Sequence, residues 1–155
     1  ADGSLHGEEG TALVSAEDYA DFEFTFDWRV AEGGRGEVLF RVSEDEASPE
    51  QTGPVMQLAG HGDTLAGNGF VPPERALTPQ YGVWYRGKIV VFGNQVEHWL
   101  NGERVLRYLL DMPDWRQAVS ASKYSAYRDF GRLREGRIVL SGHRVEFRNL
   151  KVRPL

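Results

Sequence analysis

One carboxylate and one imidazole of this chain stand where they could transfer protons. Glu37 directly follows a Gly-Gly-Arg-Gly segment and opens a run of strand-forming residues. Apolar neighbours raise the pKa of a carboxyl group, so a partly covered Glu37 would make a general base. His143 lies in a Ser-Gly-His-Arg segment and could act as acid or base, because an unperturbed imidazole titrates near neutral pH. Glu37 could instead pair with Arg35 or Arg41, and His143 could be an exposed turn residue.

Five further side chains suit a sugar or a keto oxygen as ligand. Arg41, Gln57 and Lys123 can donate hydrogen bonds to hydroxyl and carbonyl oxygens. Trp84 and Tyr85 carry flat rings that can stack on a sugar. The same aromatic set includes Tyr81, Tyr124 and Tyr127. Each has an ordinary alternative, because polar residues are common at strand edges and aromatic residues commonly fill the core of a sandwich.

No metal or cofactor site is predicted. His61 and Asp63 form a His-x-Asp pair in a glycine-rich stretch, which offers too few ligands for a metal site. His98 stands between Glu97 and Trp99, where a buried and hydrogen-bonded histidine is expected. The sequence contains no Ser-His-Asp arrangement, phosphate loop, EF-hand or dinucleotide fingerprint that we could identify.

Composition limits the class of protein. The 155 residues fit one domain, 1–155, and the net charge of −5 argues against a nucleic-acid partner, because phosphate binding needs a concentrated basic surface. There is no cysteine, which excludes disulfides and thiolate metal sites. No apolar run approaches the roughly 20 residues of a membrane-spanning helix. The first residues lack the features of a signal peptide, so the location is left open, with secretion or the periplasm as one option.

The strongest fold signal lies in residues 88–110. Three strand-like runs, 88–92, 95–100 and 103–110, are separated by Gly93-Asn94 and Asn101-Gly102. Both dipeptides tolerate positive φ, and Asn-Gly suits a type I′ turn. This stretch therefore predicts a three-stranded antiparallel meander, which needs a second layer to cover its apolar face.

The rest of the chain supplies more strands. Aromatic and polar residues alternate with period two through residues 22–30, the pattern of a half-buried strand. Other expected strands are 11–15, 37–42, 55–58, 137–140 and 145–152. Residues 33–36, 60–80, 123–135 and 141–144 are expected as loops or turns, and a short helix at 115–119 with Asp114 as N-cap. The pattern indicates an all-β, two-sheet antiparallel β-sandwich with one short helix.

Several segments together resemble a known family. The matching segments are 21–29, Leu39-Phe40-Arg41-Val42, 52–54, Met56-Gln57, 59–63, 93–102, Ser122-Lys123 and 147–155. With these segments the sequence resembles the 3-keto-disaccharide hydrolase domain family from about residue 2 to the end. The resemblance implies a concanavalin A-like jelly-roll sandwich. The Val-Glu-His-Trp-Leu-Asn-Gly segment and the Phe-Arg-Asn ending are its most specific parts.

The resemblance implies a groove on one sheet face that takes oxidised sugars. In such a groove a 3-keto glycoside loses its glycosidic bond, because a base removes the acidified proton on C2 and the C1 substituent is expelled before water adds. This chemistry needs a base, a group that stabilises the enolate oxygen and an acid for the leaving group. Arg41, Gln57 and Lys123 match family positions, and His143 is retained from the family's Gln-Asp-His-Gly segment.

The departures from the family fall where this chemistry would be. Val55 replaces a glutamate, and Arg35-Gly36-Glu37 replaces Asn-Ser-Gly. Val83 and Tyr85 make a third segment more apolar than the family pattern, which favours a less hydroxylated ligand. By this resemblance, the family's usual first strand, before Asp2, is expected to be missing. Scaffold positions are thus retained while polar site positions change.

Three hypotheses follow. The first is a hydrolase or lyase of 3-keto glycosides, with Glu37 and His143 in proton transfer and Arg41, Gln57, Lys123, Trp84 and Tyr85 in binding. The second is a non-catalytic carbohydrate-binding module that keeps the groove. The third is an engineered or repurposed site with Glu37 as base. A sugar or other small molecule is the expected ligand, and an exposed sheet edge could pair with a second copy of the chain.

Overall fold

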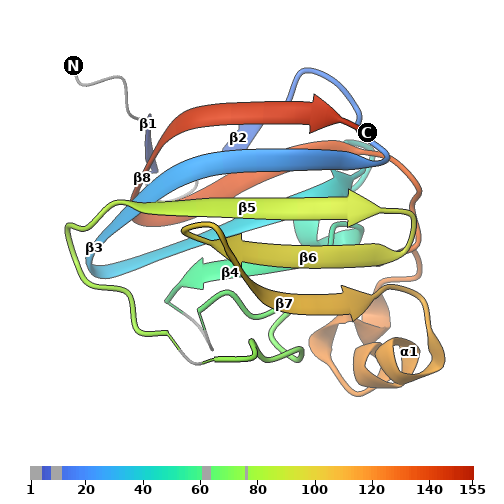
Figure 1. Ribbon diagram of the computed structural model, residues 1–155. Helices are drawn as coiled ribbons and strands as arrows, with labels where there is room; N and C mark the ends of the chain where they lie inside the picture. Colours follow the sequence, from blue (N-terminus) through green and yellow to red (C-terminus); the bar gives the residue numbers. More distant parts are fainter. Residues whose placement is uncertain (1–4, 8–11, 61–63, 76) are drawn as a thin grey trace.

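The structure, a computed structural model, describes the backbone of residues 5–7 and residues 12–60, 64–75 and 77–155. Two long strands, β3 (Phe22–Val42) and β8 (Arg137–Pro154), hold the fold together. They pair antiparallel with each other, and each runs through both layers, β3 from front to back and β8 from back to front (Figure 1). Hydrogen bonding is therefore continuous through an open eight-stranded sheet that is folded into two layers.

The two layers differ in size. The large layer has the order β1-β8-β3-β5-β6-β7, and the small layer consists of β2, β8, β3 and β4. The strands are β1 (Leu5–Gly7), β2 (Ala12–Val14), β4 (Val55–Ala59), β5 (Tyr85–Phe92), β6 (Gln95–Leu100) and β7 (Glu103–Leu109). The helices are α1 (Pro113–Ser120) and the 3-10 turns η1 (Pro49–Gln51) and η2 (Lys123–Ala126). The predicted two-sheet antiparallel sandwich with one short α-helix is confirmed.

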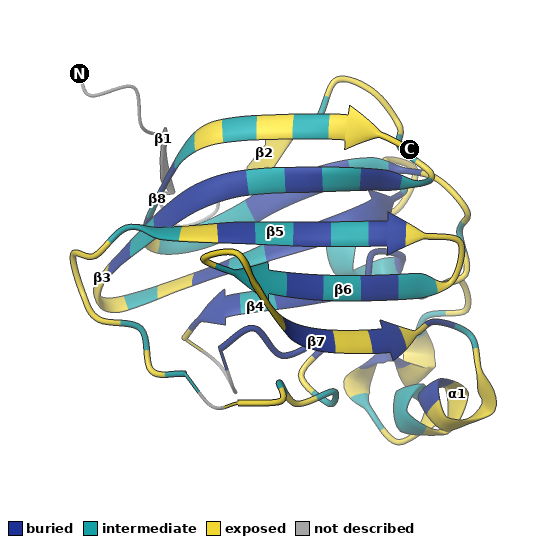
Figure 2. Cartoon of the chain, viewed as in Figure 1, coloured by how far each residue is buried: buried dark blue, intermediate teal, exposed yellow. Residues whose placement is uncertain are grey.

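Side chains from both layers form one main core. Every second residue of β3, from Phe22 to Val30, is buried, while the residues between them face outward with the polar side of the large layer. Figure 2 shows this alternation along β3 and β5. The predicted period-two strand is therefore correct, and its aromatic face is the face that packs against the small layer.

The meander of β5, β6 and β7 is also as predicted. Asn101 and Gly102 both have positive φ, 48° and 85°, which a type I′ turn requires. Between β5 and β6, Gly93 has a φ of 59°. The buried His98 lies in β6, and its Nδ1 is 2.8 Å from the carbonyl oxygen of Leu65. The expectation of a buried, hydrogen-bonded histidine is confirmed.

The expected breaks in β3 and β8 are wrong. Residues 33–36 and 141–144 were expected as a loop and a turn, yet each lies within one continuous strand. The two glycine-containing segments pair with each other, since Gly36 is opposite Gly142. A Cβ at Gly142 would lie 2.3 Å from the carbonyl oxygen of Arg35. The glycines therefore allow two backbones to approach closely where the strands pass between the layers.

An aromatic stack closes one end of the sandwich. The ring of Phe130 lies between Trp115 of α1 and Tyr124 of η2, with ring centroids 5.6 and 4.0 Å apart. The helix begins at Pro113 with Met112 as N-cap, so the prediction of Asp114 as the cap is wrong. Pro113 fits this place because the first helical position needs no backbone N–H. In the part of the chain that the structure describes, no helix is long and apolar enough to cross a membrane.

Candidate functional site

A row of polar side chains crosses the outer face of the small layer. Glu37 of β3 is the cross-strand partner of Gln57 on β4 and of Ser141 on β8. Cross-strand partners share a face of the sheet, so these three side chains stand side by side. The intervening residues Val38 and Leu140 point the other way, into the main core. The three polar side chains are only partly buried, which leaves them within reach of a ligand.

His143 stands in the next row of the same face. Its cross-strand partner is Arg35, two residues before Glu37, so His143 is a diagonal neighbour of Glu37. Diagonal neighbours in an antiparallel pair lie about 7–8 Å apart. A carboxylate and an imidazole at this separation can reach neighbouring atoms of one ligand. Nδ1 of His143 is buried and makes no hydrogen bond within the described part of the chain.

The row on the other side of Glu37 is apolar. Leu39, Val55 and Val139 are cross-strand partners and are almost fully buried, in a cluster separate from the main core. Within the described strands of the small layer, residues 12–14, 35–42, 55–59 and 137–143, Glu37 is the one carboxylate. The site is therefore a single acid beside an apolar floor.

Tyr124 extends the site from the aromatic end of the sandwich. Burial, with the negative charges of Glu37 and Glu50, raises the pKa of Tyr124 to about 12. Its hydroxyl therefore stays protonated at neutral pH and can donate a hydrogen bond. Lys123 forms an ion pair with Glu50 at 3.2 Å and lies 5.2 Å from the centroid of the Tyr124 ring. Lys123 thus lies at the edge of this site, partly neutralised by Glu50.

Arg41 lies outside this site, beside Ala20 and Asp21. Its guanidinium donates two hydrogen bonds to the carbonyl oxygen of Ala20, at 2.9 and 3.2 Å, and lies 3.4 Å from Asp21. The side chain is 5% exposed, and burial lowers its pKa. These contacts tie the end of β3 to the segment that precedes it. The structure does not bring Arg41 together with Glu37 and Gln57.

Trp84 and Tyr85 also lie apart from Glu37, beside the large layer. The ring of Tyr85 stacks on Trp28 at 5.0 Å, and its hydroxyl accepts a hydrogen bond from the backbone N–H of Gln80. The ring of Trp84 is contacted by Arg148 at 3.8 Å and by Arg29 at 4.6 Å. Both aromatic residues thus have partners within the protein, and their predicted role in binding stays a prediction.

Ser141, Glu50 and the hydroxyl of Tyr124 were missed as site residues. Ser141 could be recognised only from its pairing with Glu37. That pairing joins segments far apart in the sequence, so no local pattern indicates it. Tyr124 was considered only for stacking. Its approach to Glu37 depends on how η2 packs against the small layer, for which the sequence holds no local signal. The pair His61 and Asp63 lies outside the described residues, and the described residues hold no cluster of three or more metal-ligating side chains.

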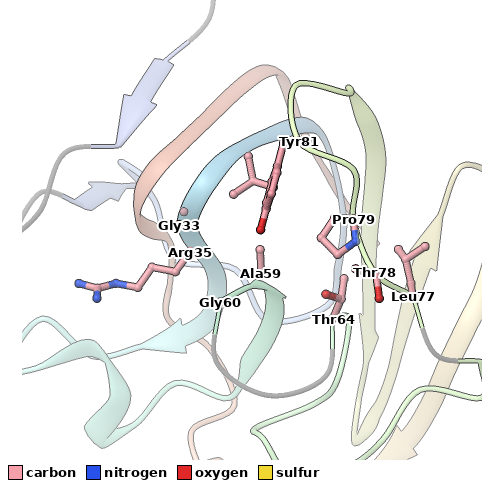
Figure 3. Close-up of a pocket in the computed structure, with 11 residues that line it drawn as sticks. Gly33, Arg35, Ala59, Gly60, Thr64, Leu77, Thr78, Pro79 and Tyr81 are labelled. Atoms are coloured by element: carbon pink, nitrogen blue, oxygen red, sulfur yellow. The ribbon is translucent and has the colours of Figure 1, made fainter.

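A cavity of about 490 Å³ opens where β3 bends between the layers. Its lining comes from three parts of the chain. These are Val30 and Gly33 to Arg35 of β3; Ala59, Gly60 and Thr64 near the end of β4; and Leu77, Thr78, Pro79 and Tyr81. Figure 3 shows the ring of Tyr81 with its hydroxyl directed toward Ala59, while the side chain of Arg35 extends away from the centre of the cavity. Arg35 belongs both to this cavity and to the row that contains His143.

The sequence model of the 3-keto-alpha-glucoside-1,2-lyase-like domain family matches residues 1–153. The chain belongs to this family. A curated 3-keto-disaccharide hydrolase from Bacteroides thetaiotaomicron is 25% identical over 99% of the chain, and the chain spans 65% of that relative's length. The predicted family resemblance is therefore confirmed.

Solved structures agree with the sandwich. A protein from Parabacteroides distasonis, named provisionally as a glycosyl hydrolase, has a TM-score of 0.86 and 25% identity, covering 98% of this chain and 79% of that one. The carbohydrate-binding module CBM66 from Bacillus subtilis has a TM-score of 0.65 at 16% identity, covering 98% and 83% of the two chains. At that low identity the second similarity concerns the fold alone.

Proposed function

We propose that the chain cleaves glycosides of 3-keto sugars, with the outer face of the small layer as its active site. The family match and the name of the curated relative support a glycoside hydrolase-like activity. Glu37, His143, Gln57 and Tyr124 are the residues that we assign to the reaction. The order of the row, with one carboxylate between an amide and a hydroxyl, is the observation that carries the assignment.

The reaction begins at C2 of the sugar. The 3-keto group acidifies the C2 proton, Glu37 removes it, and the electron pair moves to the keto oxygen as an enolate. The enolate then forms a C1–C2 double bond and expels the C1 oxygen, which takes a proton. Water then adds across the C1–C2 double bond, which places a hydroxyl on C1 and a proton on C2 and leaves a single bond between them. The sum of these steps is hydrolysis of the glycosidic bond.

Each assigned residue has a physical reason for its role. Glu37 is the one carboxylate in the described strands of this layer, and it lies beside the apolar row of Leu39, Val55 and Val139. The Gln57 amide and the Tyr124 hydroxyl donate hydrogen bonds to the enolate oxygen, where negative charge develops. His143, the diagonal neighbour of Glu37, protonates the departing oxygen.

Deuterium exchange tests the first step directly. The wild-type protein, incubated in D₂O with a 3-keto glucoside, is expected to incorporate deuterium at C2 and release the C1 substituent, both followed by mass spectrometry. Glu37→Gln is expected to slow both by about 10²–10⁴-fold. Glu103→Gln is the matched control, because Glu103 is exposed on β7 of the large layer and pairs with Arg75. Equal exchange in wild type and Glu37→Gln would remove Glu37 from the reaction.

Carbohydrate binding without turnover is the second candidate. Next to Glu37, the row of the sheet consists of the apolar residues Leu39, Val55 and Val139. The described strands of this layer therefore offer Glu37 no second carboxylate as a catalytic partner. The fold is shared with a carbohydrate-binding module. Sugar binding by the wild-type protein, with neither exchange at C2 nor release of the C1 substituent, would support this candidate over the enzyme.

A further inference from the structure

We propose that a second, smaller cavity of the sandwich binds a dianion of the phosphate or sulfate type. The cavity has a volume of about 270 Å³ and is lined by the segment before β3, the end of β3, the β5–β6 turn, Asp111 and residues 131–134. Neither Glu37 nor any other residue assigned to the reaction lines it. The anion site is therefore separate from the proposed active site and does not depend on the proposed function.

Three guanidinium groups line this cavity. Arg41 comes from β3, and Arg132 and Arg134 come from the segment that follows Phe130. Burial lowers the pKa of Arg41, and the nearby positive charge of Arg134 lowers it further. Like charges that converge on one small space repel each other, and an anion between them removes this repulsion.

The two carboxylates in the lining already have partners. Asp21 lies 3.4 Å from the guanidinium of Arg41 and accepts a hydrogen bond from the backbone N–H of Gly93 at 2.8 Å. Asp111 forms an ion pair with Arg116 at 2.8 Å, and this hydrogen bond lowers the pKa of Asp111. Each carboxylate is thus matched by one arginine.

Arg132 and Arg134 are left over in this balance of charges. Both side chains are exposed, and within the described part of the chain neither forms an ion pair or a side-chain hydrogen bond. Two positive charges therefore remain at the cavity after its carboxylates are neutralised. A dianion matches these two charges, whereas a single carboxylate group would match only one of them.

Arg41 supplies a rigid donor on the inner side of the site. Its side chain is 5% exposed, and its Nε and Nη2 donate to the carbonyl oxygen of Ala20. Its Nη1 makes no hydrogen bond with the described residues, so two of its five N–H groups are available to a ligand. Hydrogen bonds from a charged donor are strong, and a guanidinium that is already held in place loses little freedom on binding.

The test measures binding of inorganic phosphate and sulfate to the full chain by isothermal titration calorimetry. The ionic strength is held constant with sodium chloride, at about pH 8, where phosphate is mainly a dianion. Both dianions are expected to bind saturably, and acetate at least about fivefold more weakly. Backbone amide signals of residues 93–94 and 131–134 should shift in NMR spectra as phosphate is added. Glycerol 3-phosphate, compared with inorganic phosphate, distinguishes a phosphate group on a small molecule from the free ion.

Variants of the two exposed arginines locate the site. Arg132→Gln and Arg134→Gln are each expected to weaken phosphate binding about fivefold, the loss of one partly exposed ion pair. These variants avoid Arg41, whose replacement would also lower the stability of the fold. Arg107→Gln is the matched control, because Arg107 is exposed on β7, outside this cavity, and binds Gln95.

Four outcomes would overturn the proposal. They are no saturable binding of phosphate or sulfate, equal binding of acetate, unchanged phosphate affinity in both Arg132→Gln and Arg134→Gln, and an equal loss of affinity in Arg107→Gln. None of these measurements uses a sugar or follows turnover. Failure of the anion site is therefore distinguishable from failure of C2 exchange in the proposed reaction.

Discussion

Glu37 and Gln57 are direct cross-strand partners on the outer face of the small layer. A carboxylate and a primary amide at adjacent strand positions can contact two atoms of one small ligand. Ser141 continues the row on the other side of Glu37, and Tyr124 approaches from η2. This local arrangement, rather than any one residue, motivates the following predictions about activity.

Replacing Gln57 should affect ligand binding more than folding. Gln57→Ala removes one amide that we place on the enolate oxygen, so kcat/KM of the C2 exchange reaction is expected to fall about tenfold. The free energy of unfolding should change by less than about 1 kcal/mol, because Gln57 is only partly buried. Gln95→Ala, which removes a partner of Arg107 on the large layer, serves as control and should leave kcat/KM unchanged.

Replacing Tyr124 by phenylalanine distinguishes the role of its hydroxyl in the reaction from the role of its ring in packing. Tyr124→Phe keeps the stack on Phe130, so urea denaturation should show a change of less than about 1 kcal/mol. Turnover should fall about tenfold or more, because a hydrogen-bond donor to the developing enolate is lost. Tyr127→Phe, which loses only a long hydrogen bond to Glu50, should retain turnover. Equal turnover in the Tyr124 variant and wild type would assign this hydroxyl no part in the reaction.

Arg41 can be assigned to structure or to binding by measuring both. Arg41→Met is expected to lower the free energy of unfolding by about 2–3 kcal/mol, because the carbonyl of Ala20 loses two charged hydrogen bonds. Turnover per folded molecule should be unchanged. The exposed Arg128 provides the matched control, and Arg128→Met should be neutral in both measurements. Normal stability with reduced turnover would instead support the substrate-binding role predicted from the sequence.

The buried His98 should make the fold sensitive to mild acid. Burial lowers the pKa of His98 to about 4, whereas an unfolded chain has a value near 6.5. The folded state favours the neutral ring of His98. The contribution of this group to the free energy of unfolding is therefore complete above about pH 6.5 and is lost as pH falls toward 4. Urea denaturation should therefore show a loss of roughly 1 kcal/mol between pH 7.5 and 5.5 from this group.

Two variants identify the source of that pH dependence. His98→Gln should be less stable than wild type at neutral pH but should lose this part of the slope between pH 7.5 and 5.5. Gln95→Ala, which removes a partner of Arg107 on the large layer and no titratable group, should keep the wild-type slope. The same slope in His98→Gln and wild type would show that other groups cause it.

Gly142 should be intolerant of a side chain. Gly142→Ala would bring a Cβ within 2.3 Å of the carbonyl oxygen of Arg35, and the free energy of unfolding is expected to fall by about 1–3 kcal/mol or more. Gly102→Ala is the control, since no atom lies within 4 Å of its added Cβ and only the cost of positive φ, about 1 kcal/mol, applies. Similar losses in the two variants would show that close approach of β3 and β8 is not critical.

The fold could be predicted largely because its signals are local. Alternation from Phe22 to Val30 repeats every two residues, and Asn101-Gly102 meets the φ requirement of its turn within two residues. The continuity of β3 and β8 could not be predicted in the same way. Glycine normally interrupts a strand, but here Gly36 and Gly142 face each other and are stabilised by pairing between segments at opposite ends of the chain.

Period, turn residues and motifs are properties of short segments, so the amino-acid sequence was enough to predict the sandwich class, the meander, the family and the candidate types of chemistry. Which of the candidate residues lie together depends on how distant segments pair in the fold. Glu37, Gln57 and His143 share a face, whereas Arg41, Trp84 and Tyr85 have partners elsewhere. The physical reason is register: pairing of β3 with β4 and β8 fixes which side chains are neighbours, and a shift of one residue would turn each of them to the opposite face.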